Sequence, residues 1–339
     1  MAERDCLPRL SQLLRFRCGL ATDPSSSPLQ TLCLGGPTLI RRIRAVLYRR
    51  SLAQRLRKIL FTELQTWQLL ALAGIVGVVW AASLFDWSFV TGRHAFWQFP
   101  QGTIGGSGAD MVTELVGYLY YVQSPWRLPL FYVSALGAPF GTNIMFTGSV
   151  PIIALIGKLV YSLTGATINL YGGYLFLCFV LPGMMMTPLL TAAKVRYALA
   201  AVVAAIFANA MPALLWRWGH ILYEAHFLLI GALTLYLVTI NRRSWRSVTT
   251  AWTAYLIFTC LTDNYLFAMV GVVWLCAVMQ RRLNGIATTR ELLGTGTLTI
   301  ALVVSVMALS GQFGAGIHGR EVAYRQAQAD RHRHPAHGR

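Results

Sequence analysis

The sequence predicts an all-α protein, a polytopic transmembrane helical bundle. Of its 339 residues, 55% are hydrophobic and 12% are charged, and the mean hydropathy is +0.53. Soluble domains carry roughly twice that share of charged residues. Several apolar runs are long enough for spanning helices, each of which needs roughly 20 apolar residues. These observations exclude an ordinary soluble domain and indicate a multi-pass membrane protein.

The predicted transmembrane domain covers residues 67–316 and holds about eight helices. The first helix, 67–87, starts too far into the chain and is too long to be a signal peptide. Because residues 251–279 exceed one span, we expect two short, tilted helices there, with a turn at residues 261–264. The other predicted spans are 150–166, 170–190, 196–214, 221–240 and 293–310.

The segment before the first span is strongly basic. Residues 1–66 hold twelve basic and four acidic side chains, a net charge of +8. Such a run before a spanning helix marks the cytoplasmic side and binds anionic membrane lipids. No zinc-finger, RNA-recognition or helix-turn-helix pattern accompanies it, so we expect no nucleic-acid partner. We predict a cytoplasmic, partly disordered N-terminal region.

The later arginine clusters fix the orientation but conflict with the number of spans. Residues 242–246 and 281–282 are expected on the cytoplasmic side, like the N-terminus. One crossing for each of the five predicted spans before Arg242 would instead place Arg242 outside. We therefore expect either that one segment only dips into the membrane or that residues 128–147 contain a further crossing.

A long first extracytoplasmic loop is predicted at residues 88–149. It is expected to carry two short amphipathic helices, 111–122 and 128–136, and its many aromatic residues are typical of a loop at the headgroup layer. Loops of this length are often functional. At the other end of the chain, residues 317–339 contain five arginines and four histidines but no Leu, Phe or Trp. This composition predicts a disordered or aberrant tail.

Acidic side chains are rare in the transmembrane domain, and this rarity identifies the candidate site. Six occur between Trp67 and Gly316, and five of them are predicted on the outer side, opposite the arginines. Carboxylates at membrane depth are costly and usually functional. Asp110 follows the glycine-rich residues 105–109, and Glu114 lies four residues later on the same helix face. The pair is expected either to cap a helix or to bind a ligand, which includes a divalent cation.

A second group of polar residues surrounds the start of the span 221–240. His220 and Glu224 are expected to lie one helical turn apart and to form a hydrogen bond. Arg217, between two tryptophans, suits a phosphate group, although an interfacial anchor is the alternative. The spacing of His220, Glu224 and His226 is not that of a zinc protease, so no metal site is predicted. Asp263, at the turn of the helical hairpin, is expected to cap the second helix.

Two other features carry less weight. Lys158 lies inside an apolar run and is expected to extend toward the membrane surface or to pair with a carboxylate. The six cysteines show no metal-ligand spacing and are expected to be small buried side chains or reduced thiols.

Several motifs occur together in one arrangement along the chain. They are Asp110, Trp126-Arg127-Leu128-Pro129-Leu130, Gly137-Ala138-Pro139-Phe140-Gly141-Thr142-Asn143-Ile144, Phe146-Thr147-Gly148-Ser149-Val150-Pro151, Gly219-His220 and Ala225-His226-Phe227. This arrangement, within residues 67–316, resembles a branch of bacterial multi-pass proteins related to the GT-C glycosyltransferases. In that branch an acid often stands where this chain has Gly148.

The resemblance implies a GT-C-like bundle in the bacterial inner membrane that transfers a sugar from a polyprenyl-phosphate donor to a cell-envelope acceptor on the extracytoplasmic face. It implies that Asp110 is the base that deprotonates the acceptor hydroxyl, with Glu114 beside it. The expected ligands of the donor phosphate are Arg217, His220 and His226, with Glu224 and Asp263 in supporting positions.

Two other hypotheses stay open for this sequence. One is a transporter or lipid flippase, which would place charged groups near the bilayer midplane. The other is an inactive, truncated relative. The expected partners are membrane lipids and the lipid-linked sugar, with no defined protein partner, and the cofactor is unknown except that a divalent cation is compatible with the site.

Overall fold

The computed structural model describes residue 54 and residues 60–93, 108–137, 141–216 and 220–313, with the backbone alone at 108–110 and 216. Apart from residue 54, the described part belongs to one compact unit that starts at Leu60. It is almost entirely helical, and its only sheet pairs β1 (Tyr132–Val133) with β2 (Thr142–Asn143) in antiparallel fashion. The predictions for residues 1–59 and 317–339 lie outside these residues.

Five helical segments of the described part are long and apolar enough to cross a membrane, as expected for a multi-pass membrane protein. They agree closely with the predicted spans 67–87, 170–190, 221–240 and 293–310 and with the second half of 251–279. The five segments are α3 (Thr66–Leu84), α7 (Tyr171–Ala192), Ile221–Thr239 (the 3-10 turn η2, Ile221–Glu224, followed by α10, Phe227–Thr239), α12 (Asn264–Leu283) and α13 (Thr289–Ser310).

The predicted helical hairpin at 251–279 is confirmed, and its two helices reach beyond the predicted range at both ends. Its first helix is α11 (Trp245–Cys260), and Leu261 and Thr262 form the turn before α12. The predicted span 196–214 is broken into α8 (Ala198–Asn209) and α9 (Pro212–Trp216). Pro212 has no backbone N–H, which explains why a new helix begins there.

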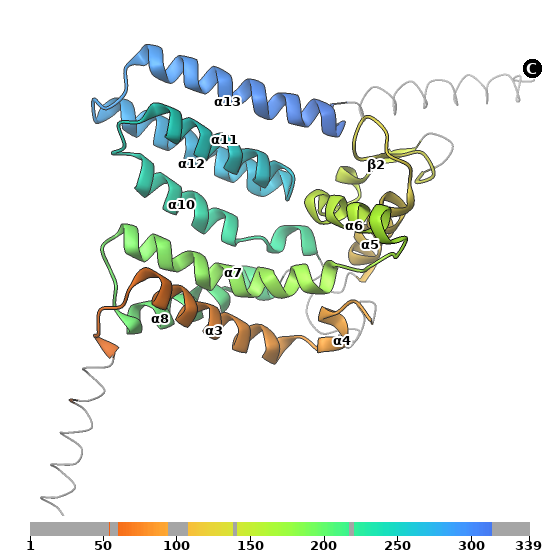
Figure 1. Cartoon of the computed structure of the whole chain (residues 1–339), viewed down its shortest axis with the longest axis horizontal. Helices are drawn as coiled ribbons and strands as arrows, with labels where there is room; N and C mark the ends of the chain where they lie inside the picture. Colours follow the sequence, from red (N-terminus) through yellow and green to blue (C-terminus); the bar gives the residue numbers. More distant parts are fainter. Residues whose placement is uncertain (1–53, 55–59, 94–107, 138–140, 217–219, 314–339) are drawn as a thin grey trace, which may run out of the picture. The chain divides into compact units, whose positions relative to one another are not determined.

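Successive helices run between two ends of this unit (Figure 1). We call one the arginine end, which holds residues 60–65 and the connections 193–197, 240–244 and 284–288. Leu64 N donates to the carbonyl of Arg196 at 3.0 Å, which joins the starts of α3 and α8. We call the other the acidic end, which holds α4 (Trp87–Val90), α5 (Gly108–Gln123), α6 (Pro151–Thr164), η2 and the turn at 261–263.

Helix α6 does not run between the two ends, so the predicted span 150–166 is wrong. Ile152 N donates to the carbonyl of Leu261 at the acidic end, and the chain after α6 reaches Asn169, whose carbonyl faces Gly92 at the same end. The helix has 14 residues, about 21 Å of length. It stops at Gly165, which adopts a left-handed conformation.

The position of α6 removes the disagreement between the number of predicted crossings and the expected side of Arg242. Of the described helices that run between the two ends, four precede Arg242: α3, α7, α8 continued by α9, and α10. Arg242 therefore returns to the end at which α3 starts. Of the six acids between Trp67 and Gly316, five lie in elements of the acidic end, and Glu291 alone lies at the arginine end.

In the part of the predicted outer loop 88–149 that the structure describes, about half of the residues are helical. Residues 111–122 belong to α5, as expected, whereas 128–136 form turns and strand β1, so the prediction of an amphipathic helix there is wrong. Pro129 disfavours a helix before it and cannot donate a hydrogen bond. Leu130 N instead donates to the carbonyl of Leu309 at 2.8 Å, and Asn143 Nδ2 donates to the carbonyl of Ser310 at 2.6 Å. These bonds dock the loop on the end of α13.

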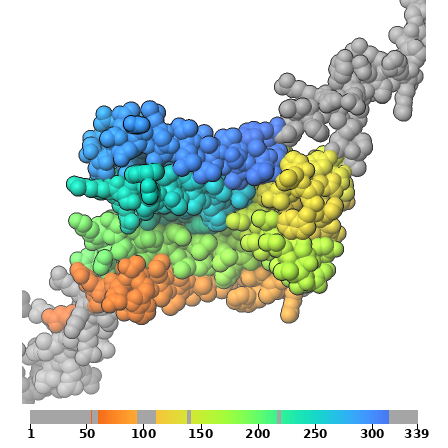
Figure 2. All heavy atoms as spheres, turned by 45° about the horizontal axis from the view of Figure 1, so that its top comes forward, coloured from red at the N-terminus to blue at the C-terminus, as the bar shows by residue number. Residues whose placement is uncertain are grey.

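A continuous apolar core underlies the acidic end. It combines side chains of α5, α6, the first half of α7, η2 and the start of α10. Figure 2 shows the segment between α5 and α6, in yellow, beside α6, in yellow-green, at one end of the helices. Its large fully buried members include Tyr118, Tyr121, Phe131, Ile144, Tyr171 and Ile221.

Candidate functional site

Glu114 is buried on α5 with its side chain against the loop that follows η1 (Ile144–Phe146). It is only 4% exposed. Gly148 faces it with a φ of +76°, and a Cβ on Gly148 would lie 3.0 Å from Cγ and 3.3 Å from Oε1 of Glu114. Only glycine adopts this backbone conformation readily. An acidic residue at 148, expected from the resemblance, would therefore lie directly against the Glu114 carboxylate.

Hydroxyl groups surround the backbone of Glu114. Ser149 Oγ donates to the Glu114 carbonyl at 2.6 Å, and Thr147 Oγ1 lies 2.9 Å from Ser149 Oγ. Tyr171 OH donates to the same carbonyl at 3.4 Å and accepts from Val150 N at 3.2 Å. These bonds attach residues 147–150 and the start of α7 to one position of α5.

The first two turns of α7 bring three buried carboxylates to one helix face. Tyr171, Tyr174 and Cys178 lie at positions i, i+3 and i+7, so they share that face. Each lies near enough to an acid from a different element for the charge of that acid to act on it. The pairs are Tyr171 with Glu114, Tyr174 with Asp263, and Cys178 with Glu224.

Asp263 caps α12, as predicted. Its Oδ1 accepts from Tyr265 N at 2.6 Å, and the residue is only 1% exposed. Among the described residues, Oδ2 has no hydrogen-bond partner. Burial raises the pKa of Asp263 to about 6, against the opposing effect of the backbone hydrogen bonds. This carboxyl group therefore exchanges its proton near neutral pH.

The raised pKa of Asp263 predicts a pH-dependent stability. Because the folded pKa lies above the unfolded value of 3.8, the folded state binds the proton more tightly, and this contribution to stability is lost as pH rises from about 4 to about 6. The change amounts to at most about 3 kcal/mol. Asp263→Asn keeps the capping oxygen and should remove this part of the pH dependence, as measured by thermal unfolding in detergent at pH 4.5 and 7.5. Parallel pH profiles for both proteins would contradict the assignment.

The residues around η2 adopt a geometry different from the predicted one. His220 precedes the 3-10 turn Ile221–Glu224, so His220 and Glu224 are not one α-helical turn apart, and that premise is wrong. The His220 ring instead lies 5.6 Å from the ring of Tyr223. Glu224 is fully buried, and its carbonyl accepts from His226 N at 2.8 Å.

The side chain of Lys158 is held at the C-terminal end of α5. Its Nζ donates to the carbonyl of Tyr121 at 3.1 Å, to Ser124 Oγ at 2.9 Å and to the carbonyl of Pro125 at 3.3 Å. A cation at a helix C-terminus is stabilised by the helix dipole. Burial, and then the charge of Arg127, lower the pKa of Lys158 to about 8. The expectation of a carboxylate partner is therefore replaced by a helix-capping role.

The predicted site residues fall into three groups. Glu114, Glu224 and Asp263 meet around α7, and His220 and His226 flank Glu224 in sequence at the same end. The backbone of Asp110 lies in the first turn of α5, one turn before Glu114. Arg217 lies outside the described residues. No group of three or more His, Cys, Asp or Glu side chains within the described ranges is arranged to hold a metal ion.

Sequence reasoning missed the residues of α7. Tyr171, Tyr174 and Cys178 lie in an apolar run, where such residues are usually core. They could have been recognised from their spacing, which places three side chains with OH or SH groups on one face of a helix. That helix was also predicted to start at the outer side. Ser149 and Thr147 were part of the quoted motif but had no predicted role.

Comparison with known families places the chain in one of them. Residues 74–332, which are 259 of the 339 residues, match a domain of unknown function, DUF6311. The chain belongs to the DUF6311 family. No curated protein and no solved structure matches this DUF6311 chain. The matched range contains the whole acidic end and all five candidate spanning segments except the first turns of α3.

Proposed function

We propose that this DUF6311 protein is an integral-membrane glycosyltransferase that moves a sugar from a polyprenyl-phosphate donor to a cell-envelope acceptor. The observation that supports this most is the convergence of Glu114, Glu224 and Asp263 around the first turns of α7. The helix that carries Asp110 and the segment that carries His220 and His226 lie at the same end. Carboxylates kept at membrane depth indicate function.

In this proposal Asp110 is the catalytic base. It accepts the proton of the acceptor hydroxyl while that oxygen bonds to the anomeric carbon of the sugar. The bond from this carbon to the phosphate oxygen breaks, and polyprenyl phosphate leaves. Glu114, one turn further along α5 and buried, is a positioning residue that holds α5 against residues 147–149.

The donor phosphate needs cationic groups, because negative charge gathers on it as it leaves. Arg217, His220 and His226 are the proposed ligands, and a divalent cation is compatible with this chemistry. Arginine binds phosphate in a two-pronged geometry, and histidine carries a charge that depends on its surroundings. The apolar helices next to this end provide the lipid environment for a polyprenyl chain.

The proposal places the acidic end on the extracytoplasmic face of a bacterial inner membrane. The arginine end would face the cytoplasm, because loops rich in Lys and Arg are retained there. The described part of the arginine end carries Lys194, Arg196, Arg242, Arg243, Arg246, Arg281, Arg282 and Arg290.

The test is consumption of a polyprenyl-phosphate sugar by the purified protein in lipid vesicles. A sugar labelled in the donor should appear on an acceptor or in water, with release of polyprenyl phosphate. An intact donor after long incubation, with a panel of donor sugars and a cell-envelope extract as acceptor, would contradict the proposal.

Proton-coupled transport is the second candidate, and one observation favours it. Asp263 is buried, one of its oxygens has no hydrogen-bond partner in the described part, and its pKa is raised to about 6. Such a group can carry protons near neutral pH. Movement of a lipid-linked sugar between leaflets without its consumption, driven by a pH gradient, would favour transport over transfer.

A further inference from the structure

Three aromatic rings lie next to one another at the acidic end, in η2 and the first turn of α12. The centre of the His220 ring lies 5.6 Å from that of Tyr223. The centre of the Tyr223 ring lies 5.1 Å from that of Tyr265, with the two ring planes at 80° in an edge-to-face arrangement. Both distances are usual for interacting aromatic rings. The rings therefore form one row, which starts at a proposed phosphate ligand and ends at Tyr265.

The local backbone fixes this row. Side chains three residues apart eclipse one another in a 3-10 turn, which brings Tyr223 beside His220. The backbone N–H of Tyr265 donates to the buried carboxylate of Asp263 at 2.6 Å. The two segments also send buried side chains into the same apolar core. Because the fold already orders the rings, a ligand that stacks on them pays little to order them.

Tyr265 presents an open ring surface at the end of the row. Its side chain is 65% exposed, although the neighbouring Asp263 and Leu266 are buried. Asn264, next to it, is also exposed and has an amide that can donate and accept hydrogen bonds. An aromatic ring beside such a polar group is typical of a surface that binds a ligand with both apolar and polar parts.

We propose that Tyr223 and Tyr265 form a stacking surface for the sugar ring of the lipid-linked donor. This inference rests on the donor named in the proposed function. The sugar is bonded directly to a phosphate oxygen, so a phosphate held at His220 leaves the sugar ring beside the adjacent tyrosines. One face of a pyranose carries mainly C–H groups, whose small positive charge is attracted to the negative face of an aromatic ring. The ligand is therefore a pyranose joined to a lipid phosphate.

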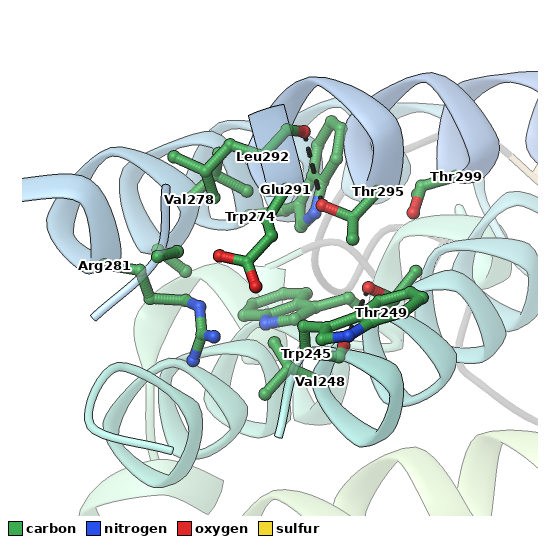
Figure 3. A pocket seen from close by; sticks show the side chains of 13 residues that line it. Trp245, Val248, Thr249, Trp274, Val278, Arg281, Glu291, Leu292, Thr295 and Thr299 are labelled. Carbon is green, nitrogen blue, oxygen red and sulfur yellow. Dashed lines mark hydrogen bonds between the residues drawn. The ribbon is translucent and has the colours of Figure 1, made fainter. Parts of the chain in front are cut away.

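The hollow beside Arg281 and Glu291, at the arginine end, is no alternative site for a sugar. Figure 3 shows the side chains of these two residues together with Trp245 and Trp274, which also line it. Its volume is about 20 Å³, enough for about one water molecule. Arg281 is buried there, and its Nη1 donates to the carbonyl of Thr239 at 2.7 Å.

Binding of the donor with and without its sugar tests the stacking surface. The full chain in lipid nanodiscs is titrated with polyprenyl phosphate and with its glucose, mannose and galactose conjugates. The wild-type protein should bind at least one conjugate about tenfold more tightly than polyprenyl phosphate alone. Tyr265→Ala should abolish this difference and leave the affinity for polyprenyl phosphate unchanged. Because the side chain is exposed, the fold of the variant should persist.

Two further variants serve as controls. Tyr265→Phe keeps the ring and should keep the tenfold difference. Tyr120→Ala removes a tyrosine that is 47% exposed on α5, at the same end but outside the row, and should keep the difference as well. Wild-type affinities in Tyr265→Ala, or an equal loss in Tyr120→Ala, would overturn the stacking surface and assign Tyr265 to the aromatic belt at the membrane surface.

Failure of this inference and failure of glycosyl transfer give different results. If the protein consumes the donor but Tyr265→Ala binds like the wild-type protein, transfer stands and the stacking surface is wrong. If the protein binds a conjugate through Tyr265 but leaves it intact, the stacking surface stands and transfer is wrong. A wild-type protein that prefers no conjugate to polyprenyl phosphate would overturn the stacking surface whatever its activity.

Discussion

Asp110→Asn is expected to lower sugar transfer by at least about 100-fold, the usual contribution of a general base. Asparagine has almost the same shape as aspartate, but it cannot accept the proton of the acceptor hydroxyl. Insertion into the membrane and donor binding should be unchanged. The measurement is the initial rate of donor consumption by the purified variant in lipid vesicles.

Glu63→Gln is a suitable control for this substitution. Glu63 is an exposed carboxylate at the arginine end, so removal of its charge should leave the rate unchanged. If Asp110→Asn transferred sugar at the rate of the wild-type protein, Asp110 would not be the base, and the role assigned to α5 would be wrong. An equal loss in both variants would instead indicate a general effect of charge.

Gly172→Ala is expected to destabilise the fold by about 3 kcal/mol, at the upper end of the cost of overpacking. A Cβ on Gly172 would lie far inside contact distance of the carbonyl oxygen of Phe89, which belongs to the backbone of α4 and cannot rotate away. Helix α7 would have to shift, and with it Tyr171 and Tyr174. The measurement is thermal unfolding of the purified protein in detergent.

The neighbouring Gly173 gives the matched control. A Cβ there would lie 3.6 Å from the carbonyl oxygen of Val90, an ordinary contact. Alanine favours the helix over glycine, so Gly173→Ala should be neutral or more stable by about 0.5–1 kcal/mol. Equal effects of the two substitutions would contradict the close packing of α7 on α4.

Hydropathy predicted most of the spanning helices because a bilayer demands long apolar runs. It failed for 150–166, because a helix that is buried at one end of a bundle is as apolar as one that spans it. The contacts of Ile152 with Leu261 and of the following chain with Gly92 distinguish the two cases, and neither can be read from composition. The parity of the arginine clusters was the better guide, because it required either one segment that does not cross or one further crossing, and the position of α6 agrees with the first alternative.

The acidic residues of the candidate site could be predicted because carboxylates are rare in the transmembrane domain. Carboxylates are few in this chain, so Glu114, Glu224 and Asp263 could be selected before their convergence was visible. The helical spacing predicted for His220 and Glu224 was wrong, because the chain forms a 3-10 turn there. Backbone geometry at a break between two helices depends on packing, which local sequence does not specify.

The central claim is that α5 and the segment before α10 reach the same face of the membrane, opposite the arginines. The most direct measurement is labelling of single cysteines by a membrane-impermeant maleimide in intact cells, in a background without native cysteines. Val112→Cys and His220→Cys should be labelled from outside, and Arg243→Cys only after the cells are permeabilised. Labelling of positions 112 and 220 from opposite sides would contradict the account.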